Sequence, residues 1–264
     1  MKPALRIRKA LIPAAGAGSR MGYLSAILPK CMYPVADKPI IHRVVDNARL
    51  LGAEEFVIVT HFKEDIVRDY FRKVLVPELK IKVMFVHQKS LTGLADAIAL
   101  GSDYIDEPFV VILGDDYTVA TDFENLFTAF DRHPEAVVVE GIVKEKDPRK
   151  LRHACCVKRD PSGRIAKIVE KPKKPSVPVR GIGIYLFRPE IFEAIRTTPV
   201  TPERHEREIT ETIRMLAEQG RAYAEFIHGT NLNINSFDDL LLAWNTHFHL
   251  DPFLDSFRSQ GLGG

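Results

Sequence analysis

The sequence predicts an α/β fold with a doubly wound, mostly parallel (mixed) central sheet and a small antiparallel subdomain. Two observations lead to this prediction: short apolar segments alternate with helical patterns through the first half of the chain, and strand-like segments joined by turns dominate the second half. The chain has 264 residues, of which 45% are hydrophobic, so it can bury a sizeable core. In such sheets, ligands bind near the carboxyl ends of the strands.

The first half is expected to alternate strands with helices. Each strand is a short apolar run, and each helix shows apolar residues at the spacing of one helical face. The strands are expected at residues 10–13, 55–60, 81–86 and 109–113, and the helices at residues 41–51, 65–75 and 94–104.

The second half is expected to be richer in antiparallel strands. Turn residues such as those at 160–163 separate its apolar runs, and the prolines within residues 172–178 predict a stiff, exposed connection. The strands are expected at residues 136–143, 153–158, 165–170, 183–187 and 222–227, and the helices at residues 209–218 and 237–249.

Composition excludes several classes of partner. The net charge of +2 is the small difference between 37 basic and 35 acidic residues, so we expect neither nucleic acid nor a membrane as a partner. Three cysteines make no disulfide framework, although Cys31 beside Lys30 is a candidate for a thiol with a lowered pKa. We find no signal peptide and no apolar run long enough to span a bilayer, and therefore expect a cytoplasmic protein.

A glycine loop follows the first apolar run and predicts a phosphate-binding cradle. Gly16 and Gly18 allow the backbone N–H groups to approach an anion, because glycine has no Cβ and tolerates positive φ. Ser19 adds a hydroxyl donor, Arg20 a permanent charge, and Lys30 a second positive charge. These groups together suit a nucleoside triphosphate.

Two other types of glycine-rich phosphate loop fit this segment less well. A dinucleotide-binding fingerprint requires a third glycine where the chain has Met21, and a phosphate loop of the Walker A type requires a Gly-Lys-Ser/Thr ending that is absent. A plain strand-to-helix turn with a solvent-facing arginine remains the structural alternative.

Further motifs follow in order along the chain. Residues 11–41 carry the glycines, Ser-Arg, Pro-Lys and Lys-Pro pairs, and later blocks lie at residues 88–93, 113–116, 169–172 and 231–243. This series resembles the signature of sugar-1-phosphate nucleotidylyltransferases, most closely the bacterial UTP–glucose-1-phosphate uridylyltransferase branch. It is also similar to glucose-1-phosphate thymidylyltransferases.

The resemblance implies a Rossmann-like nucleotidyltransferase fold in a single domain over residues 1–264. A nucleotide-binding half would cover about residues 8–135, a sugar-side antiparallel subdomain about 136–230, and a metal-ligand loop with the C-terminal helix about 231–260. The family also implies a homo-oligomer, either a dimer or a tetramer.

The resemblance assigns roles to individual residues. Arg20, Lys30 and Asp115 would serve catalysis, with Arg20 on the leaving pyrophosphate and Lys30 on the reacting phosphates. Nucleotide binding would fall to Ala15, Gly16, Gly18, Ser19, Gln88 and Gly93. The sugar phosphate would be bound by Glu170, Lys171, Gly181 and Arg204. Residues 153–155 depart from the family's usual Tyr-Gly pair, which leaves the sugar open.

A magnesium site is expected at Asp115. This carboxylate follows an apolar strand and Gly114, at the strand end where a hard cation can be held with substrate phosphates. Asp116 would point to the other face, so we expect it to be a polar or helix-capping group. The family places its second ligand in a Trp-x-Asp-x-Gly block, where this chain has Asn233. Related acetylglucosamine-phosphate uridylyltransferases are known for an asparagine there, which implies Asp115 and Asn233 as the metal ligands.

The resemblance implies magnesium-dependent transfer of a nucleotidyl group from UTP, with dTTP next, to a hexose 1-phosphate, with glucose 1-phosphate favoured. The substrates would be these two small molecules. One alternative is a non-catalytic paralogue that senses or scaffolds sugar nucleotides, favoured by Asn233. A nicotinamide-dependent oxidoreductase is a second alternative, which Met21 opposes.

Overall fold

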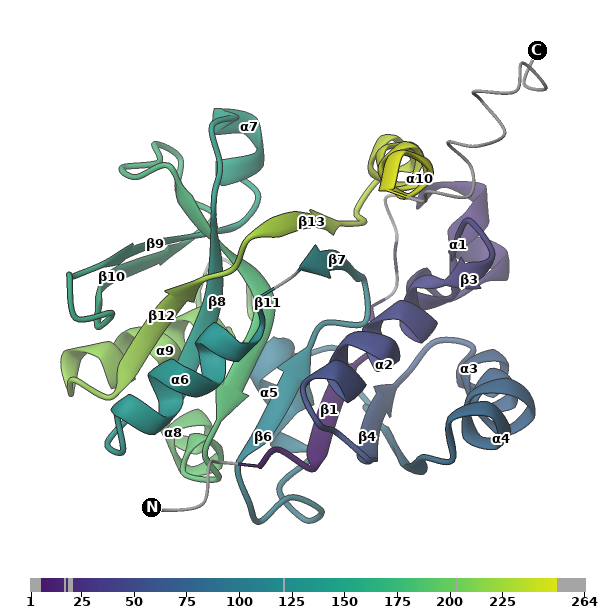
Figure 1. Cartoon of the computed structure of the whole chain (residues 1–264), viewed down its shortest axis with the longest axis horizontal. Helices are drawn as coiled ribbons and strands as arrows, with labels where there is room; N and C mark the ends of the chain where they lie inside the picture. Colours follow the sequence, from purple (N-terminus) through teal and green to yellow (C-terminus); the bar gives the residue numbers. More distant parts are fainter. Residues whose placement is uncertain (1–5, 17, 19–20, 121, 203, 251–264) are drawn as a thin grey trace.

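A nine-stranded mixed sheet runs through the centre of the molecule (Figure 1). The computed structural model describes residues 6–16, 18, 21–120, 122–202 and 204–250. The strands follow the order β10-β9-β11-β6-β1-β4-β5, and β8 pairs with β11 and β12. Their bounds are β1 (Lys9–Pro13), β4 (Glu55–Thr60), β5 (Lys82–His87), β6 (Phe109–Ile112), β8 (Val138–Lys144), β9 (Cys155–Arg159), β10 (Ile165–Glu170), β11 (Val179–Phe187) and β12 (Ala222–Phe226).

The sheet is parallel on one side and mixed on the other. Strands β6, β1, β4 and β5 run parallel, whereas β11 runs antiparallel to β6, β8 and β9. This is the predicted α/β class, with antiparallel strands in the second half of the chain. The single domain over residues 1–264 remains a prediction, which the continuity of the sheet across both halves supports.

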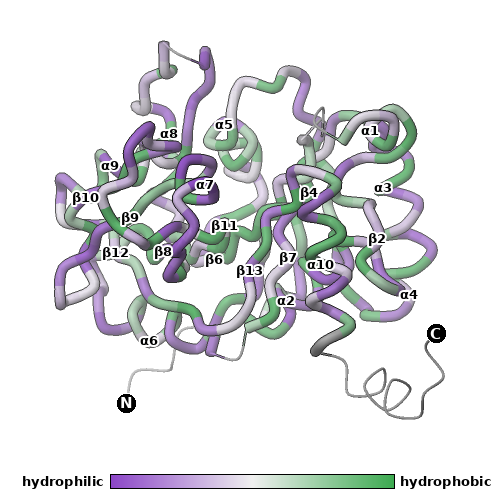
Figure 2. The backbone as a smooth tube through the Cα atoms, turned by 90° about the horizontal axis from the view of Figure 1, so that it is seen from above, coloured by the Kyte–Doolittle hydropathy of each residue, from purple (hydrophilic) through white to green (hydrophobic). Residues whose placement is uncertain are grey.

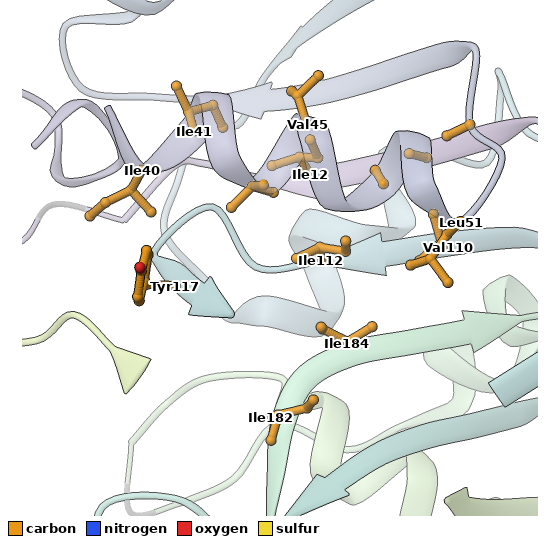
Figure 3. Packing of buried hydrophobic residues seen from close by; sticks show 14 of the residues in the cluster. Ile12, Ile40, Ile41, Val45, Leu51, Val110, Ile112, Tyr117, Ile182 and Ile184 are labelled. Atoms are coloured by element: carbon orange, nitrogen blue, oxygen red, sulfur yellow. The ribbon is translucent and has the colours of Figure 1, made fainter. Parts of the chain in front are cut away.

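Helices cover both faces of the sheet because the buried strands are apolar on both sides. Along β1, Ala10 and Ile12 face one cluster, which includes residues of α2 (Ile40–Leu50), α3 (Glu64–Tyr70), α6 (Glu124–Arg132) and α10 (Phe237–Leu250). Leu11 faces the other, with α5 (Leu94–Ala99), α8 (Ile191–Thr197) and α9 (Ile209–Glu218). Figure 3 shows Ile12 among the side chains of α2 in the first cluster.

A separate two-stranded ribbon pairs β7 (Asp116–Ala120) with β13 (Gly229–Asn233). In Figure 1 the ribbon lies beyond the carboxyl end of β6, between β8 and α10. The remaining short elements are α1 (Tyr23–Ile27), η2 (Lys30–Met32), β2 (Pro34–Val35), β3 (Lys38–Pro39), η3 (Phe71–Leu75), α4 (Val76–Leu79) and α7 (Pro148–Leu151). The residues around α7 are mostly hydrophilic (Figure 2). None of the helices in the described part of the chain is long and apolar enough to cross a membrane.

The structure departs from the predicted elements in a few places. The helix predicted over residues 65–75 becomes α3 followed by a π-helical turn. The helix predicted over residues 94–104 ends at Ala99, and the following Gly101 packs so closely on β1 that a Cβ would lie 2.3 Å from Leu11 Cδ1. The ribbon strands were not predicted, because they begin or end in polar residues and lack a continuous apolar run.

Candidate active site

Two adjoining cavities lie at the carboxyl ends of β1 and β6. The first, of about 240 Å³, is lined by residues that include Pro13, Ala15, Gly16, Lys30, Gln88, Gly93 and Asp115. The second, of about 270 Å³, is lined by residues that include Asp115, Glu170, Lys171, Gly181, Arg204 and Asn233. Asp115 lines both cavities, so it stands at their junction. The structure therefore brings together the predicted nucleotide-side and sugar-side residues as two neighbouring groups.

Lys30 is the cation at this junction. It begins the short helix η2, directly after the extended residue Pro29, and only 8% of its surface is exposed. Its ammonium donates to Asp115 Oδ2 and to Asn235 Oδ1, the latter at 2.8 Å. An ammonium has three N–H donors, so these two contacts leave one for an anion in the cavity. The second oxygen of Asp115, Oδ1, takes no part in this pairing.

The predicted phosphate loop is only partly described. Ala15 and Gly16 line the first cavity, and a Cβ added at Gly16 would have no described heavy atom within 4 Å, so a ligand can approach there. Gly18 has φ of +63° and packs on Lys30, with 3.2 Å between the two Cβ positions. It lines neither cavity among the described residues. Ser19 and Arg20 lie outside the described residues, and their roles stay predictions.

Gln88 and Gly93 line the first cavity from β5 and α5. Gln88 directly follows β5 and is 5% exposed, and its Nε2 lies 3.4 Å from the carbonyl oxygen of Gly93. Gly93 precedes α5 with φ of +125°, and a Cβ there would lie 2.3 Å from the carbonyl oxygen of Arg207. The backbone of Arg207 is therefore sufficient reason for this glycine, whatever binds in the cavity.

Asp115 and Asn233 both line the second cavity, where β7 begins and β13 ends. The backbone N–H of Ile234 donates to the carbonyl oxygen of Asp115 at 3.0 Å, which holds the end of β13 beside the backbone of Asp115. Asn233 Oδ1 accepts a hydrogen bond from Asn235 Nδ2 at 2.6 Å. Asn235 thus links Asn233 to Lys30, and sequence reasoning missed it.

We expected Asp116 to be a polar or helix-capping group on the face opposite Asp115, and it is a buried polar group that caps no helix. It begins strand β7, is 1% exposed, and accepts hydrogen bonds from the Thr118 hydroxyl and from Asn231 Nδ2. Burial raises the pKa of Asp116 to about 7, against the opposing effect of these hydrogen bonds. The backbone continues as a strand after Asp115, which turns Asp116 to the interior.

The sugar-side cavity carries charges of both signs. Thr210 Oγ1 donates to Glu170 Oε2 at 2.7 Å, and Lys171 Nζ lies 3.3 Å from Glu170 Oε1. Arg204 donates to Glu208 Oε1 at 2.6 Å, and burial raises the pKa of Glu208. All of these residues line the cavity, so a sugar phosphate there would meet both hydrogen-bond acceptors and cations.

A buried acid lies behind this cavity and was not predicted. Glu140 of β8 is fully buried, and its Oε1 accepts from Cys155 Sγ at 3.2 Å. A Cβ on Gly181 would lie 2.1 Å from the same oxygen, so glycine makes room for this carboxyl. Burial raises the pKa of Glu140 to about 8.

Cys31 was a candidate for a thiol with a lowered pKa. The structure shows the opposite, because burial raises the pKa of Cys31 to about 12.

The family model for nucleotidyl transferases matches residues 9–246. The chain belongs to this family. The predicted family and the predicted reaction class, nucleotidyl transfer, are therefore confirmed. The residues that line the two cavities lie within the matched region.

Relatives with named activities cover most of the chain. A putative UTP–glucose-1-phosphate uridylyltransferase of Bacillus subtilis is 29% identical over 89% of this chain and 94% of its own length. The UTP–glucose-1-phosphate uridylyltransferase AglF of Haloferax volcanii is 33% identical over 88% of this chain and 93% of its own length. A solved UDP-glucose pyrophosphorylase in complex with UDP-glucose superposes with a TM-score of 0.82 at 27% identity, covering 93% of this chain and 100% of that chain.

Proposed function

We propose that this nucleotidyl transferase makes a UDP-sugar and pyrophosphate from UTP and a hexose 1-phosphate, with glucose 1-phosphate as the first candidate and dTTP as the second nucleotide. The observation that carries the proposal is the pair of adjoining cavities that share Asp115, with Lys30 at the junction. The names of the relatives from Bacillus subtilis and Haloferax volcanii support UTP and glucose 1-phosphate.

In this reaction an oxygen of the sugar phosphate attacks the α-phosphorus of UTP. A new P–O bond forms, the bond between the α-phosphorus and its bridging oxygen breaks, and pyrophosphate leaves with the electron pair. Positioning and charge stabilisation dominate such transfers. The third donor of Lys30 is at the junction, where negative charge would develop. Arg20 is proposed for the leaving pyrophosphate, and Lys171 and Arg204 for the sugar phosphate.

Gln88 and Glu170 would orient the two substrates from opposite ends. The carboxamide of Gln88 offers a donor and an acceptor to a pyrimidine edge, and Ala15, Gly16, Gly18, Ser19 and Gly93 would complete the nucleotide side. Glu170, held by Thr210, presents a carboxylate to sugar hydroxyls, with Gly181 lining the same cavity.

The donor atoms at the junction fit Mg²⁺. In the described part of the chain no three His, Cys, Asp or Glu side chains cluster to hold a metal. Asp115 Oδ1 and Asn233 Oδ1 are nevertheless oxygen donors, which Mg²⁺ prefers, and this ion commonly takes one or two protein ligands plus substrate phosphates. We assign them as its ligands; when bound, the ion would neutralise phosphate charge.

A matrix of nucleoside triphosphates against sugar 1-phosphates, read by pyrophosphate release with Mg²⁺ present, tests the proposal. We expect the highest kcat/KM for UTP with glucose 1-phosphate. Binding of both substrates without pyrophosphate release would instead identify a sugar-nucleotide sensor or scaffold. The cytoplasmic location and the homo-oligomeric state also remain proposals, tested by cell fractionation and light scattering.

A further inference from the structure

A buried polar cluster forms part of the wall of the second cavity, which Asp116, Arg180 and Asn231 all line. Asn231 of β13 is 7% exposed, and its Nδ2 lies 2.8 and 2.9 Å from the two carboxyl oxygens of Asp116. Its Oδ1 accepts from Arg180 Nη1 at 2.6 Å, and Arg180 Nη2 donates to the backbone oxygen of Asn231 at 2.9 Å. Arg180, 8% exposed, also lies 3.5 Å from Glu145. None of these contacts has a role in the transfer reaction proposed above.

The carboxamide of Asn231 has only one orientation that fits this cluster. Arginine can donate hydrogen bonds but cannot accept them, whereas the carboxyl oxygens of Asp116 can accept them. The amide oxygen must therefore face Arg180 and the amide nitrogen must face Asp116. A leucine or a flipped amide at position 231 would leave at least one buried polar group without its partner, which is costly.

This cluster joins the ribbon to the main sheet. Asn231 belongs to the two-stranded ribbon of β7 and β13, whereas Arg180 belongs to β11 of the nine-stranded sheet. A two-stranded ribbon is marginally stable by itself, so its position depends on side-chain contacts with the rest of the protein. Asn231 and Asn233 are two residues apart on one strand, and their side chains point to the same face. Holding the strand at Asn231 therefore also restrains the backbone that carries Asn233.

We propose that Asn231, held by Arg180, is a positioning residue for the metal site: it sets β13 against β7 so that Asn233 Oδ1 stands beside the carboxylate of Asp115. The inference rests on the proposed function only in taking Asp115 and Asn233 as the metal ligands. Two observations support it: the Ile234 N–H, just after β13, donates to the backbone oxygen of Asp115, and Asp115 and Asn233 both line the second cavity.

The test measures Mn²⁺ binding to the purified protein by electron paramagnetic resonance, without substrates or turnover. For Asn231→Leu we expect the Kd for Mn²⁺ to rise ~10–100-fold, the usual effect of losing a partner that orients a metal ligand. Asn47→Leu is the matched control: Asn47 is also a buried amide, and it donates to the Thr118 backbone oxygen of β7 at 2.9 Å, but from α2. The Asn47→Leu variant should have a lower Tm than the wild type, and its Kd for Mn²⁺ should stay within about twofold of the wild-type value.

Arg180→Lys provides a second variant if Asn231→Leu does not fold. It keeps the charge but loses the fork that holds both oxygens of Asn231, so it should weaken Mn²⁺ binding too. An unchanged Kd in a folded Asn231→Leu or Arg180→Lys protein would overturn the inference, as would equal weakening in Asn47→Leu. Asp115→Asn, measured in parallel, separates the two proposals: if it leaves Mn²⁺ binding intact, the metal assignment itself fails.

Discussion

Replacement of Glu140 by glutamine should reduce the loss of folding stability that occurs as the pH rises from 5.5 to 8. The carboxyl of Glu140 is fully buried, and burial raises its pKa from 4.5 to about 8, with the charge of Glu170 acting in the same direction. In the unfolded chain this group ionises near its ordinary pKa, whereas in the folded protein it stays protonated up to about pH 8. The unfolded state therefore binds fewer protons between these values, and stability falls as the pH rises.

The size of the effect follows from the slope of about 1.4 kcal/mol per pH unit for one proton. Between pH 5.5 and pH 8 the contribution of Glu140 should cost about 3 kcal/mol of stability, and the loss should level off above pH 8. Two neighbours of Glu140, Cys155 on β9 and Tyr185 on β11, do not titrate in this window, because burial raises the pKa of each well above its usual value.

The assay is urea unfolding at pH 5.5, 7 and 8, followed by circular dichroism. Glu140→Gln removes the ionisable group but keeps an acceptor for the Cys155 thiol, so its stability should fall less steeply than that of the wild type. Asp116, whose pKa is also raised, is present in both proteins and cancels in the difference. Glu135→Gln is the control, because the hydrogen bond from Tyr223 lowers the pKa of Glu135 and places its effect at acid pH. Parallel curves for wild type and Glu140→Gln would refute the reasoning.

Three further predictions concern the site. Lys30→Ala should lower kcat for pyrophosphate release by ~100-fold or more, as expected for loss of a preorganised charge, with the circular dichroism spectrum unchanged. Asn233→Asp should lower the Mg²⁺ concentration for half-maximal rate, because a carboxylate replaces a neutral amide; an unchanged Mg²⁺ titration would remove Asn233 from the site. Gly181→Ala should raise KM for the sugar phosphate and lower the Tm, since its Cβ would lie 2.1 Å from Glu140 Oε1. A wild-type KM would show that the sugar phosphate does not contact the part of the second cavity that Gly181 lines.

Local motifs were sufficient to predict the first cavity. Gln88 and Asp115 each follow an apolar strand that the sequence predicts, and Lys30 belongs to the Pro-Lys pair of the first motif. The parallel strands bring their carboxyl ends together, and all three residues line the first cavity. The structure adds reasons for two of the glycines that the local sequence does not show. Gly93 makes room for the backbone of Arg207, and Gly18 packs on Lys30, which are contacts between segments separated in the chain.

The sugar side was harder to predict because its polar groups depend on pairing between distant strands. Glu140 lies in an apolar strand, and nothing nearby in sequence indicates that it accepts from Cys155. Arg180 and Asn231 are 51 residues apart and become partners only when β11 and the ribbon meet. Asp116 was expected to be a polar or helix-capping group because it would point away from Asp115; its partner Asn231 on β13 could not be read from the local sequence.

The arrangement around Asp115 explains how one carboxylate can serve both cavities. Lys30 holds Oδ2, so Oδ1 remains available to a cation without breaking that contact. Asn235 accepts from Lys30 and donates to Asn233, so the lysine, the carboxylate and the amide oxygen form one connected chain of hydrogen bonds. Because Asn235 lies just after β13, we expect a shift of the ribbon to disturb the hydrogen bonds of Asn235 to Lys30 and Asn233. The hydrogen bonds from Arg180 to Asn231 are among the contacts that join the ribbon to the rest of the protein, so we expect their loss to reach the proposed metal site through the ribbon.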